Sequence, residues 1–264
     1  MEKVEVAQLV IRTQTDDGYR YFLARRTRDS CWEWIGGKRE EGESIIETAK
    51  RELKEEIQIE WNNYGFEIEE VAESYPSSVD SSYLLNPVLV EIGKKVFSDI
   101  SEEKLSNEHD NLFWIELSEF GDYNTLGQYE ALEKLDLVEG DVALAVVRRD
   151  GEYLLVERSE ENTSSGEWGF VSGKLEDMEE PEEAAVRELK EEANIDAEPL
   201  ETGDFYIGEG EQGYWRLFPV LLETEDREVN LNWELSDYRW TDLEELEDMK
   251  TRGRMRAVEK LELK

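Results

Sequence analysis

Three glutamates stand at helical spacing in the first half of the chain. Glu52, Glu55 and Glu56 occupy positions i, i+3 and i+4, which share one face of an α-helix. Like charges at this spacing repel one another by roughly 0.2–0.5 kcal/mol per pair, so the arrangement is unfavourable by itself. It becomes favourable where a hard divalent cation binds, because such cations prefer carboxylate oxygens. The spacing indicates a Mg²⁺ or Mn²⁺ site, with a solvated acidic helix face as the alternative.

The same pattern returns in the second half of the chain. Residues 32–59, WEWIGGKREEGESIIETAKRELKEEIQI, align without a gap to residues 168–195, WGFVSGKLEDMEEPEEAAVRELKEEANI. The equivalent acidic set is Glu188, Glu191 and Glu192. Both copies keep these glutamates while the residues around them differ freely, which favours the metal site over the solvated face.

The repeat extends on both sides of this segment. Residues 6–27 match 142–159, and EHDNLFW at 108–114 matches ELSDYRW at 234–240. The chain therefore predicts two homologous domains, residues 1–138 and 139–264. Proline and glycine are scarce around the join, which favours a short linker.

Hydrophobic periodicity predicts the elements that position these residues. Alternating apolar residues predict a hairpin of strands 4–13 and 19–25 around an Asp-Asp-Gly turn. A helix is expected over 44–57, with Ser44 and Glu47 as a capping box. The second copy predicts the equivalent helix, with Pro181 in its first turn. Further strands are expected at 83–92 and 214–224, and closing helices at 124–137 and 248–263. This order predicts an α/β fold with a mixed sheet and helices on its faces.

The repeated segment resembles the box of the Nudix hydrolases. The shared pattern is Gly-x5-Glu-x7-Arg-Glu-Leu-x-Glu-Glu-x-x-Ile, at 37–59 and again at 173–195. Both copies depart from it where the family has a glycine before the last aliphatic residue, since Gln58 and Asn194 stand there. That position ends a helix in a left-handed conformation, so Asn194 is a mild change and Gln58 a costlier one. The resemblance implies two Nudix-type α/β/α sandwich domains of the MutT type.

The resemblance also implies a role for each matching residue. The implied metal ligands are the backbone carbonyls of Gly36 and Ser172 and the carboxylates of Glu52, Glu55, Glu56, Glu188, Glu191 and Glu192. The implied bases for the attacking water are Glu52 and Glu188, with the loop residues Glu108 and Glu234 as a further base or ligand. The implied ion pairs between loop and helix are Glu43–Arg51 and Glu179–Arg187. Lys38 and Lys174 follow the loop glycines and are interpreted either as phosphate contacts or as solvated lysines.

The implied activity is hydrolysis of the pyrophosphate linkage of nucleoside di- or triphosphates or their derivatives. Water attacks phosphorus with the help of Mg²⁺ or Mn²⁺, and the tandem arrangement suggests an intramolecular pseudo-dimer of the two domains. Sequence markers for narrower substrate classes disagree. In the first copy, Tyr75 is typical of dinucleoside polyphosphate hydrolases and Pro76 of ADP-ribose hydrolases. In the second copy, Glu211 stands at the marker position and is typical of neither class. ADP-ribose or dinucleoside polyphosphate hydrolysis therefore stays an alternative. So does a module that senses a nucleotide without cleaving it, in one or both halves.

The composition limits the partners. The chain of 264 residues has 67 acidic and 30 basic side chains, a net charge of −37. Such a charge disfavours electrostatic binding to nucleic acid or to an anionic membrane. With no long apolar run and a strand-like N-terminus in place of a signal peptide, we expect a cytoplasmic protein. The acids are spread over both halves, which predicts a halophilic source whose salt screens the repulsion, against the alternative of an ordinary acidic protein.

The single cysteine and the single histidine are given minor roles. One cysteine excludes an internal disulfide and a cysteine-based zinc site, and one histidine excludes a multi-histidine site. Cys31 is predicted to be a small buried residue, because the second copy has Glu167 in its place. A general-base role for His109 is not favoured, because the second copy has Leu235 there.

Overall fold

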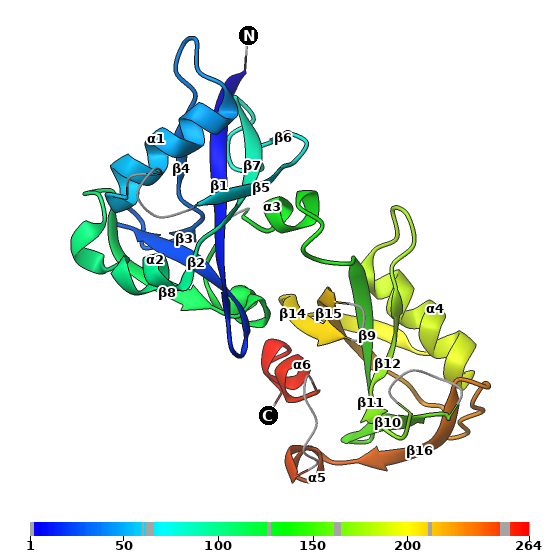
Figure 1. The fold of residues 1–264 in the computed structure, drawn as a ribbon. Coiled ribbons are helices and arrows are strands. Elements are labelled where there is room, and N and C mark those ends of the chain that lie inside the picture. Colours follow the sequence, from blue (N-terminus) through cyan, green and yellow to red (C-terminus); the bar gives the residue numbers. More distant parts are fainter. Residues whose placement is uncertain are drawn as a thin grey trace. The chain divides into compact units, whose positions relative to one another are not determined.

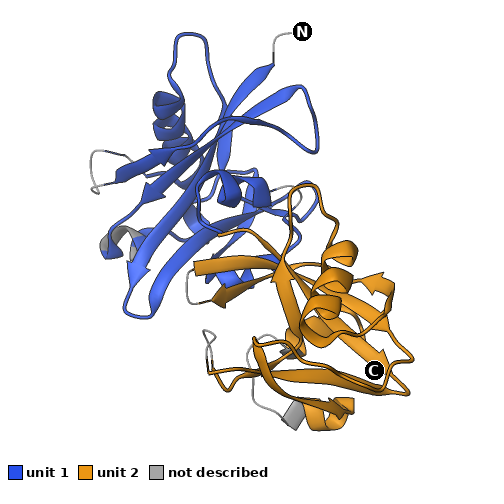
Figure 2. Cartoon of the chain, turned by 90° about the vertical axis from the view of Figure 1, so that its right-hand side faces the viewer, with its two compact units in different colours: residues 1–138 blue, residues 139–264 orange. Residues whose placement is uncertain are grey.

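The chain divides into two compact units. They are Met1–Val138 and Glu139–Lys264, coloured blue and orange in Figure 2. The computed structural model describes residues 3–59, 61, 66–125, 128–160, 165–210, 213–248 and 254–263. Glu211 and parts of both expected closing helices lie outside the described residues. No helix among those ranges is both long and apolar enough to cross a membrane.

The first unit alternates short helices with strands of one sheet (Figure 1). Its elements are β1 (Val4–Thr15), β2 (Gly18–Arg26), β3 (Trp32–Glu33), β4 (Gly36–Lys38), α1 (Ile45–Ile57), β5 (Glu67–Val71), β6 (Tyr75–Pro76), β7 (Tyr83–Glu91), α2 (Lys94–Asp99), η2 (Glu102–Lys104), β8 (His109–Ile115), η3 (Leu117–Asp122) and α3 (Tyr129–Lys134). The sheet order is β3-β2-β1-β7-β5, with β4 paired to β1, β6 to β7 and β8 to β2.

The sheet is mixed, as the sequence predicts. β1 and β2 form the expected antiparallel hairpin, but both strands run closer to the turn than predicted, with Thr15 opposite Gly18. β1 also pairs with β7 in parallel, and this central pair starts with Val4 opposite Tyr83. The apolar side of α1 packs on this sheet, and its buried residues include Ala49 and Leu53.

The second unit repeats this architecture. Its elements are β9 (Asp141–Arg149), β10 (Glu152–Arg158), β11 (Trp168–Gly169), β12 (Val171–Lys174), α4 (Pro181–Ala193), β13 (Glu198–Thr202), β14 (Tyr206–Gly210), β15 (Gly213–Glu223), β16 (Leu235–Thr241), α5 (Leu243–Asp248) and α6 (Arg254–Lys260). The sheet order β11-β10-β9-β15-β13 matches that of the first unit. One core cluster lies between the sheet and α4, and another contains residues of α5 and α6. These layers confirm the α/β/α sandwich.

The ends of the two box helices follow the predicted chemistry. Ser44 caps α1, and its capping box with Glu47 is present. In α4 the capping box joins Glu180 to Glu183, and Pro181 opens the helix. Gln58 ends α1 at φ 54° and Asn194 ends α4 at φ 53°, both left-handed. The two departures from the family's glycine therefore keep the conformation that the glycine serves.

The closing helices were predicted too long. In the first unit α3 begins only at Tyr129, because Asn124 is bound elsewhere: its backbone oxygen accepts from the Trp32 amide at 2.9 Å. In the second unit the predicted start falls in a separate helix, α5, whose Glu245 amide donates to Asp242 Oδ1 at 2.8 Å. The last helix, α6, ends at Lys260 and is followed by Glu262 at φ 49°, which stops it before the predicted end.

Candidate functional site

A cavity of about 800 Å³ lies over the glutamates of the first box. Its lining combines α1 with the β4 glycines and the loop before β8, and includes Glu52, Glu55, Glu56 and Glu108. Lys38 also lines this cavity. The fold thus brings the predicted site residues of the first copy to one place, although they come from three segments of the chain.

Arg51 holds the first box together. Its Nε lies 3.0 Å from Glu43 Oε1, and its Nη2 donates to the backbone oxygen of Lys38 at 2.8 Å. Its Nη1 lies 2.5 Å from Glu52 Oε1 and 3.0 Å from Glu55 Oε2. The hydrogen bond from Arg51 lowers the pKa of Glu43 to about 2. Loop and helix are therefore clamped by a charge-assisted network.

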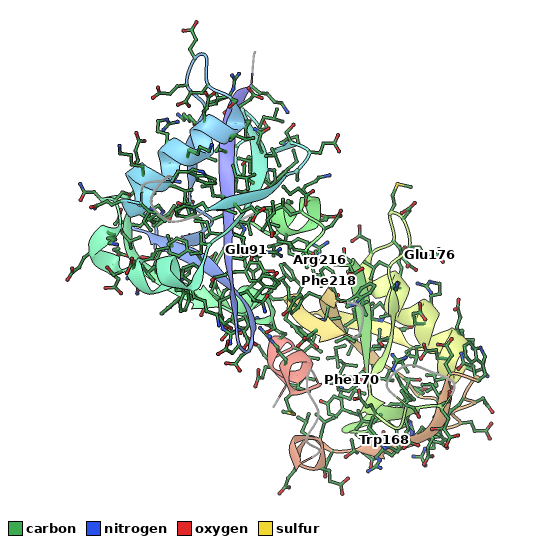
Figure 3. The ribbon with its side chains drawn as sticks, viewed as in Figure 1. Glu91, Trp168, Phe170, Glu176, Arg216 and Phe218 are labelled. Carbon is green, nitrogen blue, oxygen red and sulfur yellow. The ribbon has the colours of Figure 1, made fainter. Side chains whose placement is uncertain are left out.

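Arg187 does the same in the second box. Its Nε lies 2.8 Å from Glu179 Oε1, its Nη1 2.6 Å from Glu188 Oε1, and its Nη2 donates to Lys174 O at 3.0 Å. The pKa of Glu179 is lowered, chiefly by the hydrogen bond from Arg187. Glu176, which Figure 3 labels on the loop between β12 and α4, donates its amide to Glu179 Oε2 at 2.8 Å. Each box therefore has its own arginine clamp, and the two clamps make equivalent contacts.

The loop glycines are required by close approach to the helix. A Cβ on Gly37 would lie 1.9 Å from Glu52 Oε1, and one on Gly173 would lie 1.9 Å from Glu188 Oε1. Such distances are far inside van der Waals contact, so a side chain here would displace the glutamate. Burial raises the pKa of Glu52, against the opposing hydrogen bond from Arg51.

A buried histidine distinguishes the first box. His109 Nδ1 lies 3.0 Å from Glu56 Oε2, and its Nε2 lies 3.1 Å from Glu33 Oε1. Because both acceptors are carboxylates, the ring donates from both nitrogens only as an imidazolium. Burial alone would lower the pKa of His109, but the hydrogen bonds to Glu33 and Glu56 raise it to about 9. Ser106 Oγ also donates to Glu56 Oε2, at 2.5 Å.

The second box lacks this bridge. Leu235 stands at the position of His109, and Gly169 at that of Glu33. Glu192, the equivalent of Glu56, is 4% exposed, and its Oε2 has no hydrogen-bond partner among the described residues. Burial raises the pKa of Glu192 to about 8, although the charge of Arg158 acts against this.

The loop glutamates and the lysines occupy matching places. Glu108 donates its amide to Ser106 Oγ at 3.2 Å, and Glu234 donates its own to Asn232 Oδ1 at 2.8 Å. Burial raises the pKa of Glu192, and the negative charge of Glu234 adds to this rise. Each lysine rests on an aromatic ring: Lys38 Nζ lies 5.3 Å from the centre of the Tyr83 ring, and Lys174 Nζ lies 4.3 Å from that of Trp215.

The oxygen atoms of the two boxes are suitable ligands for a divalent cation. Across the described ranges, no three His, Cys, Asp or Glu side chains gather closely enough to hold a metal ion, and an arginine guanidinium pairs with a glutamate in each box. The carboxylates are nevertheless the oxygen donors that Mg²⁺ and Mn²⁺ prefer. The buried, unpartnered oxygen of Glu192 and the close approach of Gly173 to Glu188 also fit such a cation.

Three residues that come just before the box glycines are buried. Cys31 is buried, as predicted. Trp34 stacks on Phe120 with ring centres 5.3 Å apart, and its Nε1 donates to Gln128 O at 3.0 Å. Phe170, its equivalent, lies in the core of the second unit (Figure 3).

Sequence reasoning missed the bridge formed by Glu33, His109 and Glu56. The available signal was that Glu33 and His109 are both replaced in the second copy, by Gly169 and Leu235. Read together, the two replacements point to a contact that only the first copy makes.

Comparison with known proteins places these features in a family. A family model described as the NUDIX domain matches the chain twice, over residues 3–135 and 139–261. The CTP pyrophosphohydrolase of Escherichia coli (strain K12) is 42% identical over 57 residues, which are 22% of this chain and 42% of that protein. The chain therefore spans less than half the length of that relative. The nucleoside triphosphatase NudI of Shigella sonnei (strain Ss046) is 26% identical over 117 residues, 40% of this chain and 83% of that protein.

Solved structures also resemble parts of the chain, and two of them serve as examples. The MutT protein from Methanosarcina mazei Go1 is 26% identical, covers 43% of this chain and 86% of its own, and has a TM-score of 0.38. The Ap4A hydrolase of C. elegans, in a binary complex, is 23% identical, covers 50% of this chain and 95% of its own, and has a TM-score of 0.41.

Proposed function

Since the chain belongs to the Nudix hydrolase family, with two tandem Nudix domains, we propose that it cleaves the pyrophosphate linkage of nucleoside di- or triphosphates or their derivatives. Nudix hydrolases generally use divalent metals, and we assign Mg²⁺ or Mn²⁺ here. The observation that carries the proposal is that both units build the same clamp. Arg51 and Arg187 each join loop, helix and acidic face with matching contacts.

Each box would hold the cation with its own oxygens. The proposed ligands are Glu52, Glu55, Glu56 and the Gly36 carbonyl in the first box, and Glu188, Glu191, Glu192 and the Ser172 carbonyl in the second. When bound, Mg²⁺ or Mn²⁺ supplies Lewis-acid polarisation of the phosphoryl oxygens.

The remaining residues position the reactants. Glu52 and Glu188, or the loop residues Glu108 and Glu234, would accept the proton of the attacking water. Lys38 and Lys174 would contact the substrate phosphates from their places above Tyr83 and Trp215. The arginine clamps keep loop and helix in register, so that the oxygen donors are oriented before substrate arrives.

The substrate class is tested by a product assay over a nucleotide panel in Mg²⁺. The panel contains the common nucleoside triphosphates, an oxidised guanosine triphosphate, ADP-ribose, NADH and a diadenosine polyphosphate. One relative is a CTP pyrophosphohydrolase and another is a nucleoside triphosphatase, which supports nucleoside triphosphates as the leading substrate class. Release of a monophosphate and a second phosphorylated product from one class is the expected result. If folded protein binds Mn²⁺ but releases no product from any nucleotide of the panel, the proposed hydrolysis is contradicted.

A second candidate function applies to the first half. His109 and Ser106 both bind the same oxygen of Glu56, which favours a unit that binds a nucleotide without cleaving it. Variants with one box disabled distinguish this sensing role from catalysis in both halves. An intramolecular pseudo-dimer of the two domains remains part of the proposal, and crosslinks mapped within the monomer by mass spectrometry would test it.

We also propose that the protein works in a salt-rich cytoplasm. The net charge of −37 opposes folding at low ionic strength, and at about 1 M salt the Debye length falls to about 3 Å, which screens that repulsion. The melting temperature should therefore rise by several degrees between low salt and molar KCl. A melting temperature that stays level or falls would contradict a halophilic source.

A further inference from the structure

We propose that the two boxes take up divalent cations in a fixed order, the second box before the first. The inference rests on the proposed function, because it assumes that both boxes bind a cation. It concerns Glu56 and Glu192, which occupy the same position of the repeated pattern. Glu56 has hydrogen-bond donors from outside the box helix, whereas Glu192 Oε2 has none among the described residues.

In the first unit the acceptor oxygen is already occupied. Glu56 Oε2 lies 3.0 Å from His109 Nδ1 and 2.5 Å from Ser106 Oγ. His109 is fixed from its other side by Glu33, so the ring bridges two carboxylates. A cation that binds Glu56 through Oε2 must displace these donors, which weakens its binding.

In the second unit the same oxygen has no donor. Glu192 is buried, and its Oε2 has no hydrogen-bond partner among the described residues. Asn232, the equivalent of Ser106, uses its side-chain oxygen to accept from the Glu234 amide at 2.8 Å. Arg158 donates its Nη2 to Ser172 Oγ at 2.9 Å.

A buried carboxylate without a hydrogen-bond partner is unfavourable until a proton or a cation compensates its charge. A divalent cation at the second box would compensate it without breaking an existing hydrogen bond to Glu192 Oε2. We therefore expect the second box to bind a cation more tightly than the first.

Titration of the full chain with Mn²⁺ tests the order directly. Free Mn²⁺ is counted by electron paramagnetic resonance, in molar KCl, without nucleotide. The wild type should show two classes of site that differ on the order of tenfold in affinity. Glu192→Gln should remove the tighter class, and the matched variant Glu56→Gln should remove the weaker one. Both substitutions keep the size of the side chain.

Exchanging the bridge between the units sharpens the test. Glu33→Gly with His109→Leu gives the first unit the residues of the second, and should tighten the weaker class. Gly169→Glu with Leu235→His gives the second unit the bridge, and should weaken the tighter class on the order of tenfold. A Cβ at Gly169 would meet no atom within 4 Å, so the added side chain has room. Circular dichroism and melting curves establish that each variant is folded.

The outcomes separate the inference from the function on which it rests. Two equal sites in the wild type, or loss of the tighter class in Glu56→Gln, would overturn the order while leaving the proposed hydrolase intact. A folded wild type that binds no Mn²⁺ would overturn the proposed function itself. If an exchanged chain does not fold, the two glutamine variants decide the order by themselves.

Discussion

The first unit surrounds Glu56 with hydrogen-bond donors, whereas the second leaves an oxygen of Glu192 without one. Burial acts to raise the pKa of both carboxyls. In Glu56 the hydrogen bonds from His109 and Ser106 outweigh burial and lower the pKa, while in Glu192 burial prevails and raises it to about 8. The comparison teaches that a matching box does not fix the state of its carboxylates, because residues outside the box helix decide whether they receive hydrogen bonds.

The largest expected effect comes from disabling one box at a time. Glu191→Gln with Glu192→Gln removes the carboxylates that we expect to bind the cation first. At limiting Mn²⁺ this variant should lose at least about 100-fold in hydrolysis rate, since direct ligands matter at least as much as their outer partners. Glu55→Gln with Glu56→Gln should lose much less under the same conditions. Initial rates of product release measure both.

Saturating Mn²⁺ serves as the control for this pair. There the first box should also be loaded, and its contribution to the rate should become visible as a larger effect of the Glu55 and Glu56 variant. Equal losses in both variants at every metal concentration would break the comparison between the two units.

An intermediate effect is expected at the loop position that holds Gly36 in the first unit and Ser172 in the second. A Cβ on Gly36 would lie 2.0 Å from the backbone oxygen of Ala7, and backbone cannot move aside cheaply. Gly36→Ser should therefore lower the free energy of unfolding by about 1–3 kcal/mol. Ser172→Gly creates no clash, and it should cost about 0.5–1 kcal/mol through backbone entropy, in addition to the lost hydrogen bond from Arg158 Nη2 to Ser172 Oγ. Urea unfolding in molar salt measures the free energy of unfolding of both variants. Similar losses in the two variants would contradict the expected difference between the two loops.

The smallest effect is expected at the ion pairs that the two units share. The pKa of Glu43 lies at about 2, below the ordinary value for a glutamate, and that of Glu179 is also lowered. A lowered carboxyl pKa stabilises the fold fully above about pH 4.5, and this stabilisation is lost as the pH falls through the folded value.

Urea midpoints between about pH 6 and pH 3 test this expectation. The difference between wild type and Glu43→Gln should be constant down to about pH 4.5 and then shrink, and Glu179→Gln should behave alike. Glu198→Gln, an exposed control on β13, should show no such trend. A difference that grows on acidification would contradict the sign.

The sequence predicted the parts of the site that lie close together along the chain. The box helices, their caps and the two left-handed ends follow from local spacing and capping chemistry. Because the box pattern occurs in both copies, each copy supported the prediction made for the other.

Contacts between distant segments were not accessible in this way. The bridge joins Glu33 on β3, Glu56 on α1 and His109 on β8, and it forms because β2 pairs with both β3 and β8. The prediction of the first closing helix was wrong for a related reason. Asn124 sits within a helical pattern, yet its backbone oxygen is taken by Trp32 from another part of the chain.

The parallel pairing of β1 with β7 also has a consequence for how the chain folds. The first strand of each unit pairs with a strand far along the sequence. Val4 lies opposite Tyr83 in the first unit, and Asp141 lies opposite Arg216 in the second. Such pairing is slow because a long loop must close before contacts form. Tandem homologous units add the risk that β1 pairs with β15 instead. Synthesis from the N-terminus limits that risk, since β7 leaves the ribosome well before β15 exists.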